Sequence, residues 1–223
     1  IEIENSDFSN SIVGNTDDIH VVTCQNGYTE NDQSRIQTLK CDGNTMTFRR
    51  VLTDGSLANV LQCVANDCTP TFHLNSDKSV AGSIAGTTGE IVTVTCNPGY
   101  TNDGNTITMN TTCDGQSFSA LDTCVPNTCI STSVAYSVDF FENNSINGSV
   151  GDSFDVVCLQ GYSGGGTTTC DTNGMFNVLT CEPNPCNPGF VEYSSNYGEV
   201  DSINGTTGDV FNIECADFFV GGG

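Results

Sequence analysis

Short runs in which apolar and polar side chains alternate recur along the chain, and each run ends at a cysteine. Alternation with a period of two is typical of a β-strand with one buried face. A turn rich in Asn, Ser, Thr and Gly precedes each run, and this order of turn, strand and cysteine occurs four times. The predicted strands are Asp18–Cys24, Glu90–Cys96, Asp152–Cys158 and Asp209–Cys215. We therefore expect an all-β repeat protein.

A second shared element, Cys-x-x-Gly-Tyr, follows three of the strands. It occupies Cys24–Tyr28, Cys96–Tyr100 and Cys158–Tyr162. The glycine predicts a turn or bulge with positive φ, which other residues adopt only at a cost. The tyrosine is expected to lay its ring on a small core and to keep its hydroxyl near water.

Further cysteines complete a frame of four per repeat. A third cysteine is followed by turn residues, by a phenylalanine and then by a fourth cysteine, and a four-residue hinge leads to the first cysteine of the next repeat. The third cysteines are Cys41, Cys113 and Cys170, the phenylalanines Phe48, Phe118 and Phe176, the fourth cysteines Cys63, Cys124 and Cys181, and the first cysteines Cys68, Cys129 and Cys186. The predicted modules are residues 1–63, 68–124, 129–181 and 186–223, of which the first and last lack part of the frame.

Composition indicates that disulfides replace a large core in these modules. The chain has 223 residues, a hydrophobic fraction of 36%, no Trp and 13 Cys. Small units of this kind depend on covalent cross-links, which persist outside the cell or in a secretory lumen. Zinc is the competing explanation for many cysteines, but zinc sites favour closer pairs than Cys63 and Cys68. The expected location is therefore extracellular, and no metal site is expected.

The frame resembles that of sushi domains, also called complement control protein modules. The likeness is carried by the four cysteines, the Cys-x-x-Gly-Tyr element and the aromatic residue before the last cysteine. It is clearest for residues 68–124 and 129–181, and it departs from the family in having Phe118 and Phe176 where a Trp is usual. The resemblance implies an elongated string of small β modules with little contact beyond nearest neighbours.

The family's cysteine pairing, first with third and second with fourth, is also implied by the resemblance. It gives Cys24–Cys63, Cys68–Cys113, Cys96–Cys124, Cys129–Cys170 and Cys158–Cys181. The residues alone leave all three connectivities of four cysteines open. Each such bridge contributes about 3–4 kcal/mol, which is large for a small domain.

Three cysteines have no partner in this scheme: Cys41, Cys186 and Cys215. The chain is expected to be a window of a longer array. The alternative is that identical chains supply the partners end to end. The final Gly221–Gly223 repeats the register of Gly164–Gly166, so it is either genuine sequence or a placeholder.

Charge excludes several classes of partner. The formal net charge is −22, with 27 acidic and 5 basic residues. Such a chain repels nucleic acids and anionic membranes. Clustered aspartates leave Ca²⁺ open as a ligand, although no EF-hand loop is present. No run approaches the length of a membrane span, so no membrane insertion is expected within this segment. No signal peptide begins the sequence, and because the cysteines still imply secretion, a mature or internal fragment is expected.

Four Asn-x-Ser/Thr sequons are candidate glycosylation sites: Asn110, Asn143, Asn147 and Asn204. Such triplets also arise by chance in a chain rich in Asn, Ser and Thr. Asn147 and Asn204 occupy the same repeat position, in the turn before the strand, and are favoured for that reason.

No catalytic motif is present, and an enzyme is not expected. The only histidines, His20 and His73, lie in different modules, and no nucleophile elbow, zinc-protease helix or P-loop occurs. His20 is better explained as a strand residue. The adjacent Asp17 and Asp18 lie at an exposed turn, without the apolar pocket of a catalytic carboxyl.

Two functions remain, and the first is favoured. The first is a structural or adhesive segment of a surface stalk or filament. The second is a recognition array that binds a protein or carbohydrate through module faces. An exposed aromatic patch would favour recognition. Phe140–Phe141 and Phe218–Phe219 are the candidates, and packing against an adjoining module is the alternative explanation for both.

Overall fold

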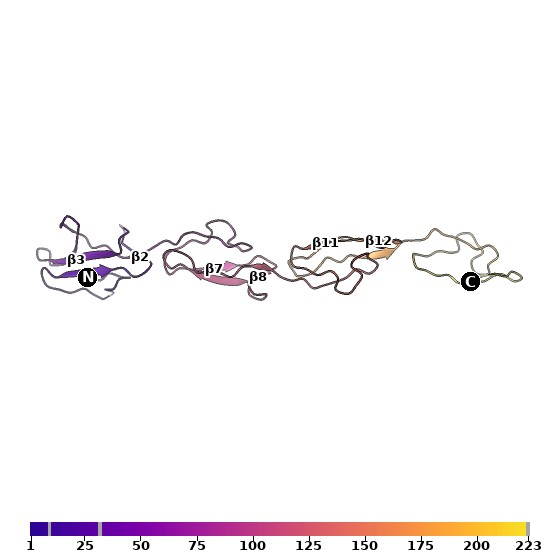
Figure 1. Cartoon of the computed structure of the whole chain (residues 1–223), viewed down its shortest axis with the longest axis horizontal. Coiled ribbons are helices and arrows are strands. Elements are labelled where there is room, and N and C mark those ends of the chain that lie inside the picture. Colours follow the sequence, from indigo (N-terminus) through magenta and orange to yellow (C-terminus); the bar gives the residue numbers. More distant parts are fainter. Residues whose placement is uncertain (9, 31–32, 222–223) are drawn as a thin grey trace. The chain divides into compact units, whose positions relative to one another are not determined.

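All regular secondary structure in the described part of the chain is β-strand (Figure 1). The structure is a computed structural model that describes residues 1–8, 10–30 and 33–221. It divides into two compact units, Ile1–Val125 and Pro126–Gly223. The all-β, disulfide-rich fold class is therefore confirmed.

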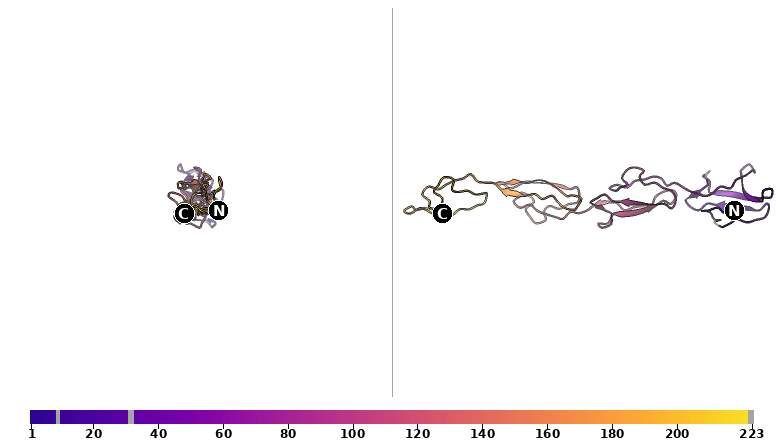
Figure 2. Two further views of the ribbon diagram at one scale, coloured as in Figure 1. Left: turned by 90° about the vertical axis from the view of Figure 1, so that its right-hand side faces the viewer. Right: turned by 180° about the vertical axis from the view of Figure 1, so that it is seen from behind.

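The strands are short, and long loops connect them, as two further views show (Figure 2). In chain order they are β1 (Ile19–Thr23), β2 (Tyr28–Thr29), β3 (Ile36–Asp42), β4 (Thr47–Val51), β5 (Leu57–Ala58), β6 (Val64–Ala65), β7 (Ile91–Thr95), β8 (Tyr100–Thr101), β9 (Thr108–Thr112), β10 (Val125–Pro126), β11 (Ser153–Val156), β12 (Tyr162–Gly164), β13 (Gly166–Thr169) and β14 (Cys181–Pro183).

One pairing recurs in three parts of the chain. The strand before the second cysteine pairs antiparallel with the strand that leads to the third: β1 with β3, β7 with β9, and β11 with β13. In residues 1–63 this pair widens into a four-stranded sheet of order β1-β3-β4-β5. A smaller pair joins the strand of the Cys-x-x-Gly-Tyr tyrosine to the hinge, as in β2 with β6 and β12 with β14.

The cores are small and repeat the same positions. The burial patterns of β1 and β7 are identical, and β11 follows them. Each pattern buries one valine, namely Val22, Val94 or Val156. A buried isoleucine from the preceding turn completes each core: Ile12, Ile84 or Ile146. Because so little apolar surface is buried, these cores need covalent support.

The predicted strand at Asp209–Cys215 is wrong. This segment has no strand, and Cys215 makes only an isolated bridge with Ser194. A strand is defined by a paired neighbour, and β1, β7 and β11 find theirs in β3, β9 and β13. The described residues after Cys215 form no equivalent strand.

The glycines of the Cys-x-x-Gly-Tyr elements have the predicted positive φ. The values are 83° for Gly27, 84° for Gly99 and 90° for Gly161. The rings of Tyr28 and Tyr162 pack against the cores of their segments, as predicted. Each turn leads from the second cysteine into the short strand that begins with the tyrosine, and β2 and β12 pair with the strands at the hinges.

Candidate interaction surface

Five disulfides form the frame that holds the surface loops. They are Cys24–Cys63, Cys68–Cys113, Cys96–Cys124, Cys129–Cys170 and Cys158–Cys181, with Cα–Cα distances from 5.5 to 6.1 Å. Within residues 68–124 and 129–181, they link the first cysteine to the third and the second to the fourth. Cys41, Cys186 and Cys215 carry free thiols; the first is buried and the second is exposed.

A hydrogen-bonded junction joins segment 1–63 to segment 68–124. The carbonyl oxygen of Gly27 accepts a bond from the Asn66 amide at 2.9 Å and another from the Thr88 hydroxyl. The Thr88 amide donates in turn to the Asn66 carbonyl oxygen at 2.9 Å. The hinge asparagine therefore lies between the glycine turn of one segment and the threonine turn of the next.

The same junction joins segment 129–181 to segment 186–223. The Asn184 amide donates to the Gly161 carbonyl oxygen at 2.8 Å, and the Thr207 amide donates to the Asn184 carbonyl oxygen at 2.9 Å. The Thr207 hydroxyl lies 3.3 Å from that oxygen. The backbone hydrogen bonds of these two junctions therefore join equivalent residues.

Backbones approach closely at the first junction. A Cβ atom at Gly115 would lie 2.3 Å from the Cα atom of Gly27, and Gly115 has a φ of +97°. Only glycine fits this position without displacement of the neighbouring backbone. The close approach supplements the hydrogen bonds of Asn66 and Thr88.

The acidic residues at the strand starts cap the preceding turns. Each accepts a hydrogen bond from the backbone amide three residues earlier, at 2.6 to 2.8 Å. The acceptors are Asp18, Glu90, Asp152 and Asp209. No group of three or more His, Cys, Asp or Glu suited to a metal occurs among the described residues. These carboxylates therefore have a local structural role.

Two further aspartates, Asp114 and Asp171, each directly follow the third cysteine of their segment. The backbone amide of Ser117 lowers the pKa of Asp114, and that of Met175 lowers the pKa of Asp171. Both carboxylates accept more than one backbone hydrogen bond, which favours the ionised form. They fix the turn that leads to Phe118 or Phe176.

Comparison with known families decides the identity of the second segment. Residues 67–124 match the family model of the Sushi repeat (SCR repeat). This segment is a sushi repeat. Its frame contains the two disulfides Cys68–Cys113 and Cys96–Cys124. No curated protein matches the chain.

The sushi repeat and its disulfides indicate an extracellular protein-interaction module. Repeats of this family are typically extracellular and non-enzymatic. None of the described residues forms a helix long and apolar enough to cross a membrane. The match at residues 67–124 therefore indicates a protein-interaction module of a typically extracellular family.

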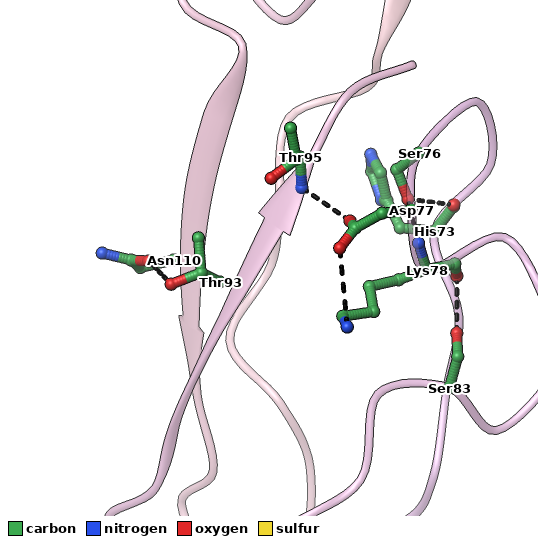
Figure 3. Close-up of polar contacts among 8 residues, drawn as sticks. All are labelled: His73, Ser76, Asp77, Lys78, Ser83, Thr93, Thr95 and Asn110. Atoms are coloured by element: carbon green, nitrogen blue, oxygen red, sulfur yellow. Dashed lines mark hydrogen bonds and ion pairs between the residues drawn. The ribbon is translucent and has the colours of Figure 1, made fainter.

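The histidines occupy structural positions. His20 lies on β1 with its ring edge-on to Phe8 and Phe48, at centroid distances of 5.8 and 5.3 Å. His73 belongs to the sushi repeat, and the nearby Ser76 hydroxyl donates to its backbone carbonyl oxygen at 2.7 Å (Figure 3). The serine is therefore not hydrogen-bonded to the imidazole in the manner of a serine–histidine pair.

All four sequon asparagines are exposed. In the sushi repeat, the Asn110 side-chain oxygen accepts a bond from the Thr93 hydroxyl at 2.8 Å, across β7 and β9 (Figure 3). The Asn204 side-chain amide donates to the Asp201 carbonyl oxygen at 2.8 Å. Asn143 and Asn147 flank the buried Ile146. All four asparagines therefore lie on the surface of their segments.

The candidate aromatic pairs differ in their surroundings. The Phe140 ring packs edge-on against Phe154 of its own segment, at a centroid distance of 5.9 Å, and Phe141 is exposed. Phe219 stacks on Tyr193, whereas Phe218 is fully exposed. The described contacts of Phe140 and Phe219 thus lie within their own segments. Of the final glycines, only Gly221 falls within the described residues.

Proposed function

We propose that the chain is a structural or adhesive segment of an extracellular stalk or filament. In this proposal the modules 1–63, 68–124, 129–181 and 186–223 follow one another and act as spacers. The observation that carries the proposal is the repeated junction, in which Asn66 and Asn184 are each bonded to the segments on both sides. A recognition array with freely moving modules would not need this arrangement.

Hydrogen bonds at the hinge limit its conformational freedom. A hinge of four residues without bonds to its neighbours would let the segments rotate. Each junction instead satisfies several backbone groups with partners from both sides, and a net contribution of about 1 kcal/mol per bond restrains that rotation. A restrained junction suits a spacer, because it maintains the distance between the ends of the joined segments.

Surface chemistry supports the same role. Glycans on Asn147 and Asn204, and on Asn110 and Asn143, would add hydrated bulk to a chain of net charge −22. Charge and glycan together keep neighbouring molecules apart and limit non-specific association. Mass spectrometry of the chain secreted from eukaryotic cells, before and after enzymatic glycan removal, tests these four sites.

The rigidity can be measured on the full chain by residual dipolar couplings of backbone amides. We expect the amides of residues 1–63 and 68–124 to fit one alignment tensor, and those of residues 129–181 and 186–223 to fit one tensor likewise. Separate tensors of different magnitude on the two sides of a junction would contradict the spacer role.

Covalent assembly of identical chains is the second part of the proposal. The free and exposed Cys186 and the free, partly exposed Cys215 support it, whereas the free thiol of Cys41 is buried. Electron microscopy of the secreted chain, with and without reductant, tests it. Fibres that disappear on reduction are expected, and uniform monomers under both conditions would end the idea.

A further inference from the structure

One turn recurs four times and has a left-handed residue at the same position. A residue with φ between 56° and 62° precedes a serine, and its carbonyl oxygen accepts a 2.8 Å hydrogen bond from the residue after the second cysteine. The left-handed residues are Asn5, Asn75, Tyr136 and Tyr193, and the donors are Gln25, Asn97, Leu159 and Ala216. The backbone geometry is therefore shared, while the side chain changes from Asn to Tyr.

This change is unfavourable for the backbone. Asparagine is enriched in the left-handed region because its side chain hydrogen-bonds locally, whereas a bulky residue is an outlier there. Strained residues of this kind point toward a role for the side chain. Tyr136 and Tyr193 are thus placed in turns that Asn5 and Asn75 occupy more easily.

Each of these tyrosines forms half of an aromatic stack. The Tyr136 ring lies on Tyr162 with a centroid distance of 4.4 Å and an interplanar angle of 11°. The Tyr193 ring lies on Phe219 at 4.4 Å and 7°. Tyr136 is 52% exposed and Tyr193 is 56% exposed, so each stack leaves aromatic surface in solvent.

The surroundings of the stacks carry only negative charge. Residues 126–223 contain twelve Asp and Glu and no Lys, Arg or His; all five Lys and Arg lie before this range. Glu192 precedes Tyr193 in the sequence, Asp139 follows Tyr136 by three residues, and Asp217 follows Ala216, whose amide binds the Tyr193 carbonyl oxygen. An anionic partner would be repelled here, and a cationic one would be attracted.

We propose that the Tyr136–Tyr162 and Tyr193–Phe219 stacks form a docking surface for a basic segment of another protein. Arginine side chains of that segment lie on the open tyrosine faces, and the carboxylates of residues 126–223 balance their charge. A guanidinium group stacks well on an aromatic face, and the attraction is stronger in an acidic environment. The proposal does not depend on the spacer role, because a spacer needs no exposed rings.

The same charge distribution argues against a second copy as the occupant. The whole chain has a net charge of −22, and residues 1–125 are themselves net negative with their five basic residues included. Docking of a second copy on the stacks, without a covalent link, would bring like charges together. A basic partner avoids this repulsion.

The test measures binding of a fluorescent twelve-residue peptide of alternating Arg and Ser to the full chain. The variants are Tyr136→Asn, Tyr193→Asn and the double variant, which place in each turn the residue found at Asn5 and Asn75. We expect the affinity to fall about three- to fivefold for each single variant and at least tenfold for the double variant. Tyr136→Phe and Tyr193→Phe keep the ring faces and are expected to retain affinity.

The substitutions leave the charge unchanged, which separates ring contact from simple electrostatic attraction. Equal binding by wild type and the double variant, or no binding by the wild type, would overturn the proposal. If the wild type binds neutral maltohexaose but not the peptide, and the double variant loses maltohexaose binding, the stacks form a carbohydrate-binding surface instead. If sedimentation velocity shows concentration-dependent dimers that are lost in Tyr136→Asn, the stacks bind a second copy of the chain instead of a basic segment. Unchanged or raised melting temperatures of the Asn variants show that these losses are not due to unfolding.

Discussion

The hydroxyl group of Thr88 donates a hydrogen bond to the carbonyl oxygen of Gly27, on the other side of a four-residue hinge. Replacing Thr88 by Val keeps the shape of the side chain and removes this donor. We expect about 1 kcal/mol less stabilisation of the junction and faster hydrogen exchange of the Asn66 amide. Exchange detected by mass spectrometry of peptides spanning residues 60–70 checks this.

Thr108→Val is the matched control, because Thr108 is an exposed threonine on β9 and the exchange is chemically the same. Thr207→Val should also raise exchange at Asn184, because the Thr207 hydroxyl donates to the Asn184 carbonyl oxygen. Unchanged protection of Asn66 and Asn184 in the two variants would mean that the hydroxyl groups do not restrain the hinges.

The close approach of Gly115 to Gly27 gives a second prediction. Gly115→Ala should destabilise the junction, because its Cβ atom would lie 2.3 Å from the Gly27 Cα atom. Gly89→Ala is the control: Gly89 has a similar φ, +85°, but nothing lies within 4 Å of its Cβ position. The control costs about 1–2 kcal/mol through its backbone alone. Gly115→Ala should cost about 1–3 kcal/mol more.

Urea unfolding of the full chain, followed through amide signals of residues 60–70 and 84–90, compares these two variants. Equal losses in stability would show that the approach to Gly27 has no energetic consequence. A larger loss in Gly115→Ala than in Gly89→Ala, seen near Asn66, supports the close contact as part of the junction.

Disulfide removal tests how the small cores are stabilised. Replacing Cys96 and Cys124 together by Ala opens a loop with a sequence separation of 28. We expect a loss of about 3–4 kcal/mol, because the unfolded chain regains conformational freedom. Cys186→Ser, which removes a free thiol, should have little effect. Urea unfolding monitored by amide signals of residues 67–124 measures the difference; a loss below about 1 kcal/mol would show a self-sufficient core.

The free thiols should differ in reactivity. Cys186 is exposed, whereas Cys41 is 8% exposed and lies in the sheet of residues 1–63. We expect Ellman's reagent to modify Cys186 rapidly and Cys41 only on unfolding, because a buried thiol is inaccessible to the reagent. Mass mapping of the labelled cysteines distinguishes them. Rapid labelling of Cys41 in the native protein would contradict its burial.

The Asp171 turn predicts a dependence of stability on pH. The Met175 amide lowers the Asp171 pKa, so the folded state favours the ionised form. This stabilisation is complete above the ordinary aspartate pKa of about 3.9 and is lost as the pH falls through the lower folded value. The difference in melting temperature between wild type and Asp171→Ala should therefore be largest near pH 7 and vanish at strongly acidic pH. Asp122→Ala, an exposed control, should show no comparable trend; a constant difference for Asp171→Ala would contradict the mechanism.

Much of the fold could be predicted because it depends on local pattern and covalent frame. Alternation located β1, β7 and β11, and the glycine of each Cys-x-x-Gly-Tyr element indicated positive φ. The pattern failed at Asp209–Cys215, where alternation was present without a partner strand. Alternation reports which side chains can be buried, while a strand also requires hydrogen bonds from a neighbour.

The docking surface of the Tyr136 and Tyr193 stacks was harder to predict from the sequence. The aligned turns before Ser6, Ser76, Ser137 and Ser194 contain a visible change from Asn to Tyr, but nothing in one sequence shows that the backbone there is left-handed. The capping role of Asp18, Glu90, Asp152 and Asp209 was hidden for the same reason, since a carboxylate at an exposed turn has several possible partners.

The order of the disulfides determines which residues would carry a pulling load. From Cys68 the shortest covalent route to Cys124 crosses the disulfide to Cys113 and then follows the backbone. The route from Cys129 to Cys181 crosses to Cys170 in the same way. Fully stretched, either backbone stretch spans only roughly 40 Å. Pulling on an oxidised chain would thus leave β7, β9, β11 and β13 outside the loaded path, so their cores could unfold without a large gain in length.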